Sequence, residues 1–412
     1  MLSLHSARER ATPPPAHAPR IGLAVAGGGP IGGMYELGAL RALDEAIDGL
    51  DLTRLDCYVG VSSGAFLAAG LANRMGTAEM CRIFITGDSD DVQFRPETFL
   101  RPAFIEYMRR AATAPRLAVE LWRDMVFRRG DSRWSDAIAR VGGLVPTGLF
   151  DSTEIEHFLR DVFTRRGRSN DFRTLPAPLF VVAVELDSGK AVRFGSEGWD
   201  DIPISRAVQA SAALPGLYAP VEVRGRHFVD GALQRTMHAS LLLERGVDLL
   251  IGVNPLVPFD SQTEVRKPDG IERRLSQGGL PVVLSQTFRT LLQSRMHVGL
   301  RRYAQTYPDI DQLVFEPNSD DGELFFTNVF SFAARRRVCE LAYRNTLDDL
   351  RRRAQDLAPV LDAHGLSLRR EVLDDPSRSV LDGLPKLPRR TETTARLRRA
   401  LDDVDHLLSS ER

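Results

Sequence analysis

The chain has 412 residues, 43% of them hydrophobic, and its 54 basic and 55 acidic residues give a formal net charge of -1. This indicates a globular protein with a sizeable core, and it excludes a global positive field that would attract nucleic acid. The three cysteines, Cys57, Cys81 and Cys339, show neither metal-ligand spacing nor a disulfide framework. We therefore expect no metal, no other cofactor and a cytoplasmic location.

The first residues carry Pro13-Pro14-Pro15 and scattered charges without an apolar core. This pattern predicts a disordered lead over residues 1–18 rather than a signal peptide. No run approaches the length of about 20 apolar residues that a membrane-spanning helix needs. Any contact with a membrane is therefore expected to be peripheral, and the sequence leaves the oligomeric state open.

Strands and helices alternate in the first quarter of the chain. Ile21-Gly22-Leu23-Ala24-Val25-Ala26 and Tyr58-Val59-Gly60-Val61 are short apolar runs typical of buried strands. Residues 34–47 have apolar side chains at helical spacing, and a second helix begins near Ala65. This βαβα order predicts a parallel sheet, with both strand-to-helix turns at the carboxyl edge where ligands bind.

The rest of the chain continues the α/β pattern and then becomes helical. Further strands are expected at residues 179–184, 191–194 and 249–253, and helices at 282–303 and 333–353. We expect a catalytic domain over residues 19–320, a helical insertion at about 94–130, and a C-terminal helical extension over 321–412 with a linker at about 374–391 before a last helix.

Gly60-Val61-Ser62-Ser63-Gly64 follows the second strand and has the G-x-S-x-G pattern. A serine between glycines at a sharp strand-to-helix turn is typical of a nucleophile elbow, which exposes the hydroxyl. The plainer interpretation is that Ser62 caps the following helix. Gly27-Gly28-Gly29 ends the first strand, and its N–H groups at a helix start are suited to binding an oxyanion.

A serine hydroxyl needs a base to become a nucleophile. Phe228-Val229-Asp230-Gly231-Ala232 places Asp230 at the end of a short strand, where a glycine lets the chain turn beside the carboxylate. Asp-Gly is also common in ordinary turns. His238 and His297 follow the serine in α/β-hydrolase order but lack a recognisable catalytic loop, and His227 and His238 are interpreted as ordinary surface or interface histidines.

The ordered combination of the glycine turn, the G-x-S-x-G turn and the later Asp-Gly-Ala resembles the patatin-like phospholipases. Ala210-Ser211-Ala212-Ala213-Leu214-Pro215-Gly216 is similar to the small-residue helix and Pro-Gly turn of that family. The resemblance, over about residues 21–253, implies a three-layer α/β fold with a mostly parallel central sheet. It also implies a carboxylic ester hydrolase (EC 3.1.1.-) acting on lipid esters.

The resemblance assigns roles to individual residues as well. It implies a dyad of Ser62 as nucleophile and Asp230 as base, without histidine. Gly27, Gly28 and Gly29 would form the oxyanion hole, and Gly60, Gly64 and Gly231 would allow the turns. In one departure, Pro30 and Ile31 stand where the family has x and Arg or Lys. Because Pro30 has no N–H, Gly28 and Gly29 are the expected donors.

Three alternatives stay open at this point. Gly27, Gly29 and Gly32 also match the dinucleotide-binding pattern, but the second strand does not end in the acidic residue that would bind a ribose. A catalytically weak lipid- or protein-binding module would keep the fold without turnover. An acyltransferase would use the same serine with an acceptor other than water.

Two arginine-rich segments allow more than one interpretation. The aromatic run at residues 325–332 precedes Arg335-Arg336-Arg337, which predicts either a buried element with a charged turn or a wedge that enters a bilayer. Residues 101–129 are interpreted as either a lid or a helical cap.

Overall fold

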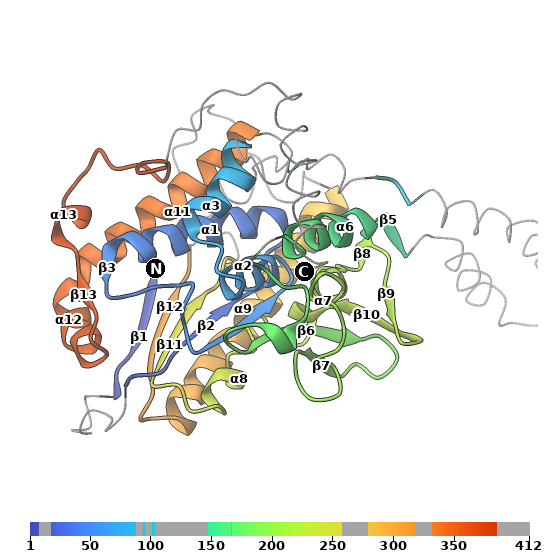
Figure 1. Cartoon of the computed structure of the whole chain (residues 1–412), viewed down its shortest axis with the longest axis horizontal. Coiled ribbons are helices and arrows are strands. Elements are labelled where there is room, and N and C mark those ends of the chain that lie inside the picture. The colour runs from blue at the N-terminus through green and yellow to red at the C-terminus, as the bar shows by residue number, and fades with distance from the viewer. Residues whose placement is uncertain are drawn as a thin grey trace, which may run out of the picture.

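The computed structural model describes residues 1–7, 18–87, 94, 101–103, 147–165, 167–257, 279–317 and 332–384. Their centre is a nine-stranded sheet (Figure 1). Its strands, in spatial order, are β1 (Leu2–His5), β12 (Asp311–Phe315), β11 (Leu249–Val253), β2 (Ile21–Val25), β4 (Cys57–Val61), β6 (Leu179–Glu185), β10 (Arg226–Asp230) and β9 (Val221–Val223), with β7 (Ala191–Phe194) also paired to β6. The middle run from β12 to β6 is parallel, and the outer pairings are antiparallel.

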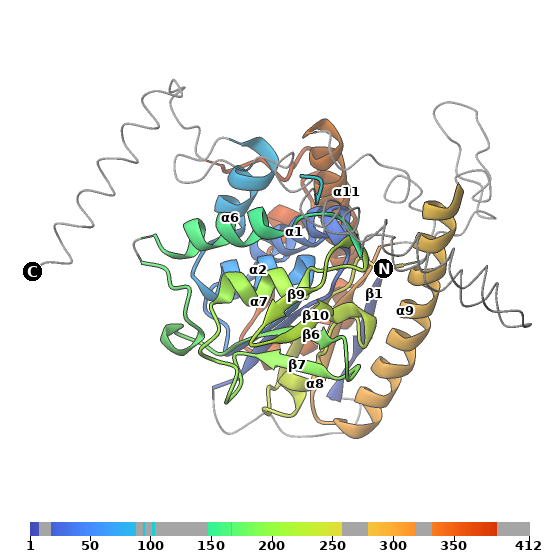
Figure 2. The same ribbon diagram turned by 90° about the vertical axis from the view of Figure 1, so that its right-hand side faces the viewer.

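Helices cover both faces of this sheet (Figures 1 and 2). Along each strand, alternate side chains enter two separate apolar cores: Leu23 and Val25 of β2 join one, and Ala24 joins the other. The larger core is covered by α1 (Gly29–Ala46), α2 (Ser63–Ala72), α3 (Thr77–Cys81), α6 (Thr153–Phe163), α7 (Ile204–Ser211), α11 (Phe332–Arg352) and α12 (Ala354–Ala363). The smaller is covered by α8 (Ser240–Leu243) and α9 (Gly279–Thr306). The expected three-layer α/β architecture with a mostly parallel centre is confirmed.

Short elements complete the described part of the chain. A π-helical turn spans Arg82–Thr86, and 3-10 turns span Phe172–Thr174 and Gly231–Leu233. Two small sheets pair β5 (Gly148–Phe150) with β8 (Gly216–Tyr218), and β3 (Ile47–Asp48) with β13 (Ser367–Leu368), which precedes α13 (Arg370–Leu373).

Strands β4 and β10 approach each other end to end along one side of β6. Val61, the last residue of β4, lies opposite Val182, and Asp230, the last residue of β10, lies opposite the next residue, Ala183. Strand β7 pairs with both Val182 and Ala183 and so occupies the other side of β6. Because β4 is parallel and β10 antiparallel to β6, the two strands point toward each other, and the residues that end them meet.

The N-terminus differs from the disordered lead that the sequence predicted. Leu2–His5 forms β1, which pairs antiparallel with β12 at the edge of the sheet, and Leu2 is buried. Arg353, which lies between α11 and α12, donates a hydrogen bond to the Leu2 carbonyl oxygen at 2.6 Å. Four residues carry too little periodicity to predict a strand, and this strand depends on partners more than 300 residues away in the chain.

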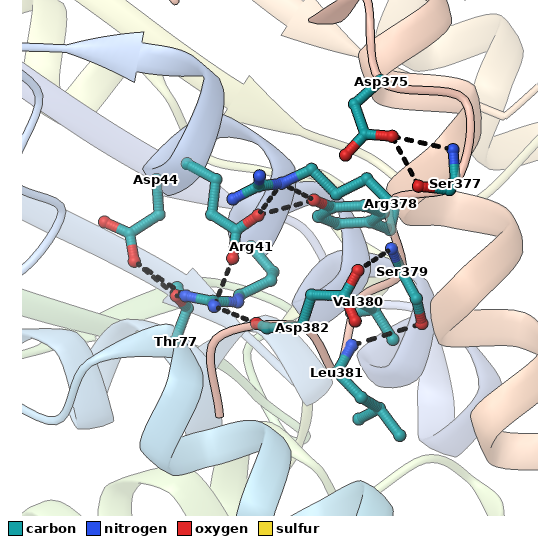
Figure 3. Close-up of polar contacts among 12 residues, drawn as sticks. Arg41, Asp44, Thr77, Asp375, Ser377, Arg378, Ser379, Val380, Leu381 and Asp382 are labelled. Atoms are coloured by element: carbon teal, nitrogen blue, oxygen red, sulfur yellow. Dashed lines mark hydrogen bonds and ion pairs between the residues drawn. The ribbon is translucent and has the colours of Figure 1, made fainter. Parts of the chain in front are cut away.

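The described part of the predicted linker, residues 374–384, is tied to α1 (Figure 3). Arg378 Nε donates to Glu45 Oε2 at 2.9 Å, and Arg41 Nη2 donates to the carbonyl oxygen of Asp382 at 3.1 Å. Val380 is fully buried. The prediction of a linker is therefore wrong for these residues, because Pro and charge content did not reveal partners on α1. The rest of the linker, the last helix, residues 325–331 and nearly all of the 94–130 insertion lie outside the described residues.

Candidate active site

Ser62 lies at the turn between β4 and α2, where its backbone is strained. Its φ of 51° and ψ of -121° are in a region that residues other than glycine rarely adopt. A Cβ on Gly64 would lie 2.3 Å from the Ala26 carbonyl oxygen, and one on Gly60 would lie 2.5 Å from the Ala65 Cα. The sequence therefore requires glycine at both positions so that α2 can begin directly against the first glycine turn. This is the geometry of a nucleophile elbow.

Hydrogen bonds hold this strained turn. The Ser62 N–H donates to Ser211 Oγ at 2.8 Å, and the Ser211 hydroxyl donates to the Val182 carbonyl oxygen at 2.5 Å. Gly64 N–H donates to the Ala26 carbonyl oxygen at 3.1 Å. Ser62 makes no side-chain capping bond to α2, so the plainer interpretation of this serine as a helix cap is not supported.

Asp230 lies beside Ser62, as the pairing of both strands with β6 requires. The Ser62 hydroxyl faces the Asp230 carboxylate in the pocket lining, and the Ala232 N–H donates to Asp230 Oδ1 at 2.9 Å. Asp230 is 3% exposed. Burial raises the pKa of Asp230 to about 6, against the opposing effects of the Ser62 hydroxyl and the Ala232 N–H. A Cβ on Gly231 would lie 2.1 Å from the Val182 carbonyl oxygen, so only glycine fits after this aspartate.

The three glycines of the first turn have different partners. Gly27 N–H donates to the Thr236 carbonyl oxygen at 3.2 Å, and Gly28 N–H donates to Ser63 Oγ at 2.9 Å. Gly29 begins α1 with a φ of 63°, and within the described residues its N–H has no acceptor. The Ser63 N–H at the start of α2 is likewise without an acceptor there. The backbone N–H groups that remain available as donors at the site are therefore those of Gly29 and Ser63.

Ile31 replaces the basic residue that the family loop usually carries. Its side chain packs against the larger apolar core. Pro30 occupies the first turn of α1, where a missing N–H removes no helical hydrogen bond. The departure from the family pattern therefore changes local charge without breaking the helix that follows the glycines.

Glu36 is a buried acid behind the loop that the sequence did not single out. It is 0% exposed, and the Ser63 hydroxyl donates to its Oε1 at 3.4 Å. Its Oε2 is buried without a hydrogen-bond partner within the described part of the chain. Burial raises the pKa of Glu36 well above its ordinary value, and the Ser63 hydroxyl opposes that shift only in part.

The histidines considered as alternative bases lie elsewhere. His238 is buried, contrary to the expectation of a surface or interface position, and its Nε2 lies 3.4 Å from the Gly231 carbonyl oxygen. Burial lowers its pKa to about 4. His297 lies 4.0 Å from Glu316 Oε2, and His227 is exposed. Within the described residues, none of the three has a hydrogen bond to Ser62.

An apolar pocket of about 120 Å³ opens beside Ser62 and Asp230. Its polar lining is confined to the two serines of the elbow, Asp230 and the tyrosine of β8, while the rest is apolar or glycine. It is lined by Gly29, Pro30, Gly33, Met34, Ser62, Ser63, Phe66, Leu67, Phe84, Phe94, Ile155, Ala212, Leu214, Leu217, Tyr218 and Asp230. Such a lining suits a hydrocarbon chain that ends at a reactive polar group.

Three residues of the site were missed by the sequence reasoning: Ser211, Ser63 and Glu36. Ser211 lies in the small-residue segment before the Pro-Gly turn, where a lone hydroxyl among alanines was a usable signal. Ser63 is the second serine of the elbow motif. Glu36 had no signal, because an acid on a helix is normally assigned to a solvent-exposed face.

Fold and site together define an α/β protein with a serine elbow, an adjacent buried carboxylate and an apolar pocket. Residues 23–243, more than half of the chain, match the family model described as patatin-like phospholipase. The chain belongs to this family, and the recognition made from its motifs is confirmed.

Curated relatives resemble a smaller part of the chain. Uncharacterized NTE family proteins of Mycobacterium bovis and Mycobacterium tuberculosis are 38% identical over 80 residues, which is 19% of this chain. The matched segment spans only about a fifth of those relatives, 21% of their length.

Solved structures are more distant. The type III effector ExoU is 17% identical with a TM-score of 0.36, covering 82% of this chain and 54% of that one. Human GIVD cytosolic phospholipase A2, in complex with methyl gamma-linolenyl fluorophosphonate, is 13% identical with a TM-score of 0.31, covering 87% and 60%. VipD from Legionella pneumophila is 20% identical with a TM-score of 0.32, covering 60% and 52%. With these TM-scores below 0.5, the family assignment comes from the sequence match alone.

Proposed function

We propose that this protein is a serine-dependent lipid acyl hydrolase that uses a Ser62–Asp230 dyad. The observation that carries the proposal is that strands β4 and β10 bring Ser62 and the buried Asp230 carboxylate together in the lining of one apolar pocket. Family membership supports a lipid ester as substrate. A pocket lined by Met34, Phe66 and Phe84 would hold the acyl chain, with its ester carbonyl at Ser62.

In the proposed reaction, Asp230 takes the Ser62 proton while Ser62 Oγ attacks the ester carbonyl carbon. The tetrahedral oxyanion is held by backbone N–H groups of the glycine turn, with Gly29 as the donor already free, Ser63 as a second, and Gly28 joining if it releases Ser63 Oγ. Collapse breaks the bond to the alcohol, which leaves with the proton from Asp230. Water then gives a proton to Asp230, attacks the acyl-serine and releases the fatty acid, and Ser62 regains the proton.

Gly27 has a supporting role in this proposal. Its N–H is held by Thr236, in the segment that follows Asp230, so the bond joins the glycine turn to the base. Gly60, Gly64 and Gly231 allow the close contacts that bring β4, α2 and β10 together. The raised pKa of Asp230 makes it a stronger base than an exposed aspartate while leaving it ionised at neutral pH.

The test is labelling with a fluorophosphonate probe, followed by mapping of the modified peptide and by turnover of a water-soluble acyl ester. We expect labelling at Ser62 and its loss in Ser62→Ala. In Asp230→Asn we expect kcat to fall by a factor of about 10²–10⁴, as for a lost general base. Full esterase activity in folded Ser62→Ala protein would contradict the proposal.

Acyl transfer and weak catalysis are distinguished in the same assay. Addition of alcohols as acceptors would yield new esters if the protein is a transferase using Ser62. A folded wild-type protein that neither reacts with the probe nor hydrolyses esters would favour a binding module instead.

A further inference from the structure

Helix α9, Gly279–Thr306, exposes an unusual amount of apolar surface. Seven large apolar side chains are exposed in the described part of the chain, and four of them belong to this one helix. They are Val283, 43% exposed, Phe288, 40%, Leu291, 59%, and Val298, 59%. Isolated apolar side chains at a surface are ordinary, but their concentration on one helix marks an interaction site.

The exposed face of α9 is regular. Phe288, Leu291, Arg295, Val298 and Arg302 follow one another at intervals of three and four residues, so they lie along one side of the helix. The adjacent side is buried: Leu292 and Met296 enter the smaller core beside the sheet. Figure 2 shows the helix running along that side of the sheet. One side of α9 therefore packs into the smaller core, and the exposed side is available to a partner.

The charge of α9 has a single sign. Between Gly279 and Thr306 there are four arginines and no aspartate or glutamate. Arg295, Arg301 and Arg302 are exposed, and two of them interrupt the apolar row. Apolar side chains interleaved with arginines fit an anionic lipid surface, where the former enter the hydrocarbon boundary and the latter meet phosphates. A generic protein interface would not require the complete absence of acids.

The position of α9 connects it to the candidate active site. The helix precedes β12, which is parallel to β11, so its N-terminal half lies toward the sheet edge where Ser62 and Asp230 meet. Arg295 Nη1 donates to the Leu233 carbonyl oxygen at 3.1 Å, and Thr236 Oγ1 donates to the Leu292 carbonyl oxygen at 3.5 Å. Leu233 and Thr236 belong to the segment that directly follows Asp230.

From these observations we propose that the face of α9 bearing Phe288, Leu291, Val298 and Arg302 docks the protein on an anionic lipid surface. The helix lies on the surface rather than through it: no helix in the described ranges is long and apolar enough to cross a bilayer. The proposal rests on the proposed function for its purpose, since a lipid hydrolase must reach an ester embedded in a bilayer. The binding itself does not depend on catalysis.

The experiment measures flotation of Ser62→Ala protein with phosphatidylcholine vesicles, with and without phosphatidylserine, so that no lipid is consumed. The double variant Leu291→Ser/Val298→Ser removes apolar surface, and Arg302→Gln removes a charge that has no hydrogen-bond or ion-pair partner in the described part of the chain. Arg295 is left in place because it contacts Leu233. Leu186→Ser, at a side chain 52% exposed on the β6–β7 turn, is the matched control.

We expect binding that requires phosphatidylserine and weakens with salt. It should fall at least tenfold in the double variant, fall less in Arg302→Gln and stay unchanged in Leu186→Ser. Equal flotation of the double variant and its parent would overturn the proposal, as would failure of the parent to bind. A self-association that the double variant abolishes, with no vesicle binding, would assign the face to a second copy of the chain and also overturn it.

A second measurement separates this proposal from the proposed function. With Ser62 intact, the double variant should hydrolyse a soluble ester as well as wild type but hydrolyse a vesicle-borne ester at least tenfold more slowly. Vesicle binding without any ester hydrolysis would support the docking proposal and contradict the proposed hydrolase function. If the double variant hydrolyses vesicle-borne ester as fast as wild type, the docking proposal is contradicted and the hydrolase function is supported.

Discussion

Helix α1 carries two buried glutamates, Glu45 and Glu36, and their surroundings compensate the buried charge to different extents. Glu45 accepts hydrogen bonds from Tyr343 at 2.5 Å and from Arg378 at 2.9 Å, and it also pairs with Arg41. Glu36, two and a half turns earlier behind the glycine turn, has the Ser63 hydroxyl, at 3.4 Å, as its one partner among the described residues. Asp230 resembles Glu36: it is buried and hydrogen-bonded, and no cation of the described chain pairs with it.

The difference between Glu45 and the two acids beside the pocket shows where the protein contains buried charges that destabilise its fold. Burial of a carboxylate is unfavourable unless cations and donors replace its water. The C-terminal segment supplies a cation to Glu45, and the contact fixes residues 375–384 on α1 (Figure 3). Beside the pocket, no residue in the described ranges supplies a cation to Glu36 or Asp230, and the pKa values of these two acids are raised instead. Uncompensated burial is a property of functional sites more often than of structural ones.

The largest expected effect on stability comes from breaking the cluster of Glu45 with Arg41 and Arg378. Glu45→Gln leaves Arg41 and Arg378 facing an uncharged amide, so we expect a loss of about 3–5 kcal/mol in the free energy of unfolding. Urea denaturation at neutral pH measures it. A loss below that of an exposed ion pair would mean that the cluster contributes little. Ester hydrolysis by the folded variant should stay near wild type.

The next effect concerns Asp230 and pH. Its folded pKa of about 6 is raised above the ordinary 3.8, so its contribution to stability is present below pH 4 and is lost as pH rises through 6. Two pKa units correspond to roughly 3 kcal/mol. Asp230→Asn should therefore gain stability relative to wild type between pH 4 and pH 7. Unfolding measured across that range checks it, with activity of wild type rising through pH 6.

A smaller gain is expected at Glu36. Glu36→Gln removes an acid whose raised pKa makes the folded state less favourable as pH rises, and it keeps an acceptor for Ser63. We expect about 1–3 kcal/mol of stabilisation at pH 8, the usual scale for an unsatisfied buried polar group, and less at pH 4. If melting temperatures at pH 8 do not rise, Glu36 has a partner that offsets its burial.

The smallest effect belongs to an exposed pair and serves as a reference. Arg369 donates to Asp48 Oδ1 at 2.6 Å, with both side chains well exposed, 40% and 62%. Arg369→Ala should change the free energy of unfolding by less than about 1 kcal/mol. A larger loss would show that the β3–β13 pairing, rather than burial, determines stability at this end of the molecule.

Much of the fold could be predicted because its signals are local. The strands at Ile21–Val25, Cys57–Val61 and Leu179–Glu185 are apolar runs. The bounds of α9 and α11 fall within three residues of those predicted, and α1 begins five residues before its predicted start. Glycines at 60, 64 and 231 showed where the chain turns tightly, which was enough to indicate Ser62 and Asp230. Their catalytic roles stay predictions that the labelling experiment tests.

What could not be predicted depends on residues far apart in the sequence. Strand β1 exists because β12 pairs with it, and residues 375–384 are held because Glu45 and Arg41 lie on α1. The burial of His238 and Glu36 likewise follows from packing. The membrane role considered for Arg335 was also undecidable from sequence: it is 3% exposed and lies over the Phe94 ring at 5.4 Å.

The end-to-end meeting of β4 and β10 on β6 has a consequence for evolution. The separation of Ser62 and Asp230 is fixed by two adjacent residues of β6, Val182 and Ala183, whatever length of chain connects the two strands. Loops between them can therefore lengthen, shorten or be exchanged without moving Ser62 relative to Asp230. Such a scaffold would let the pocket diversify while the spacing of the proposed dyad stays the same.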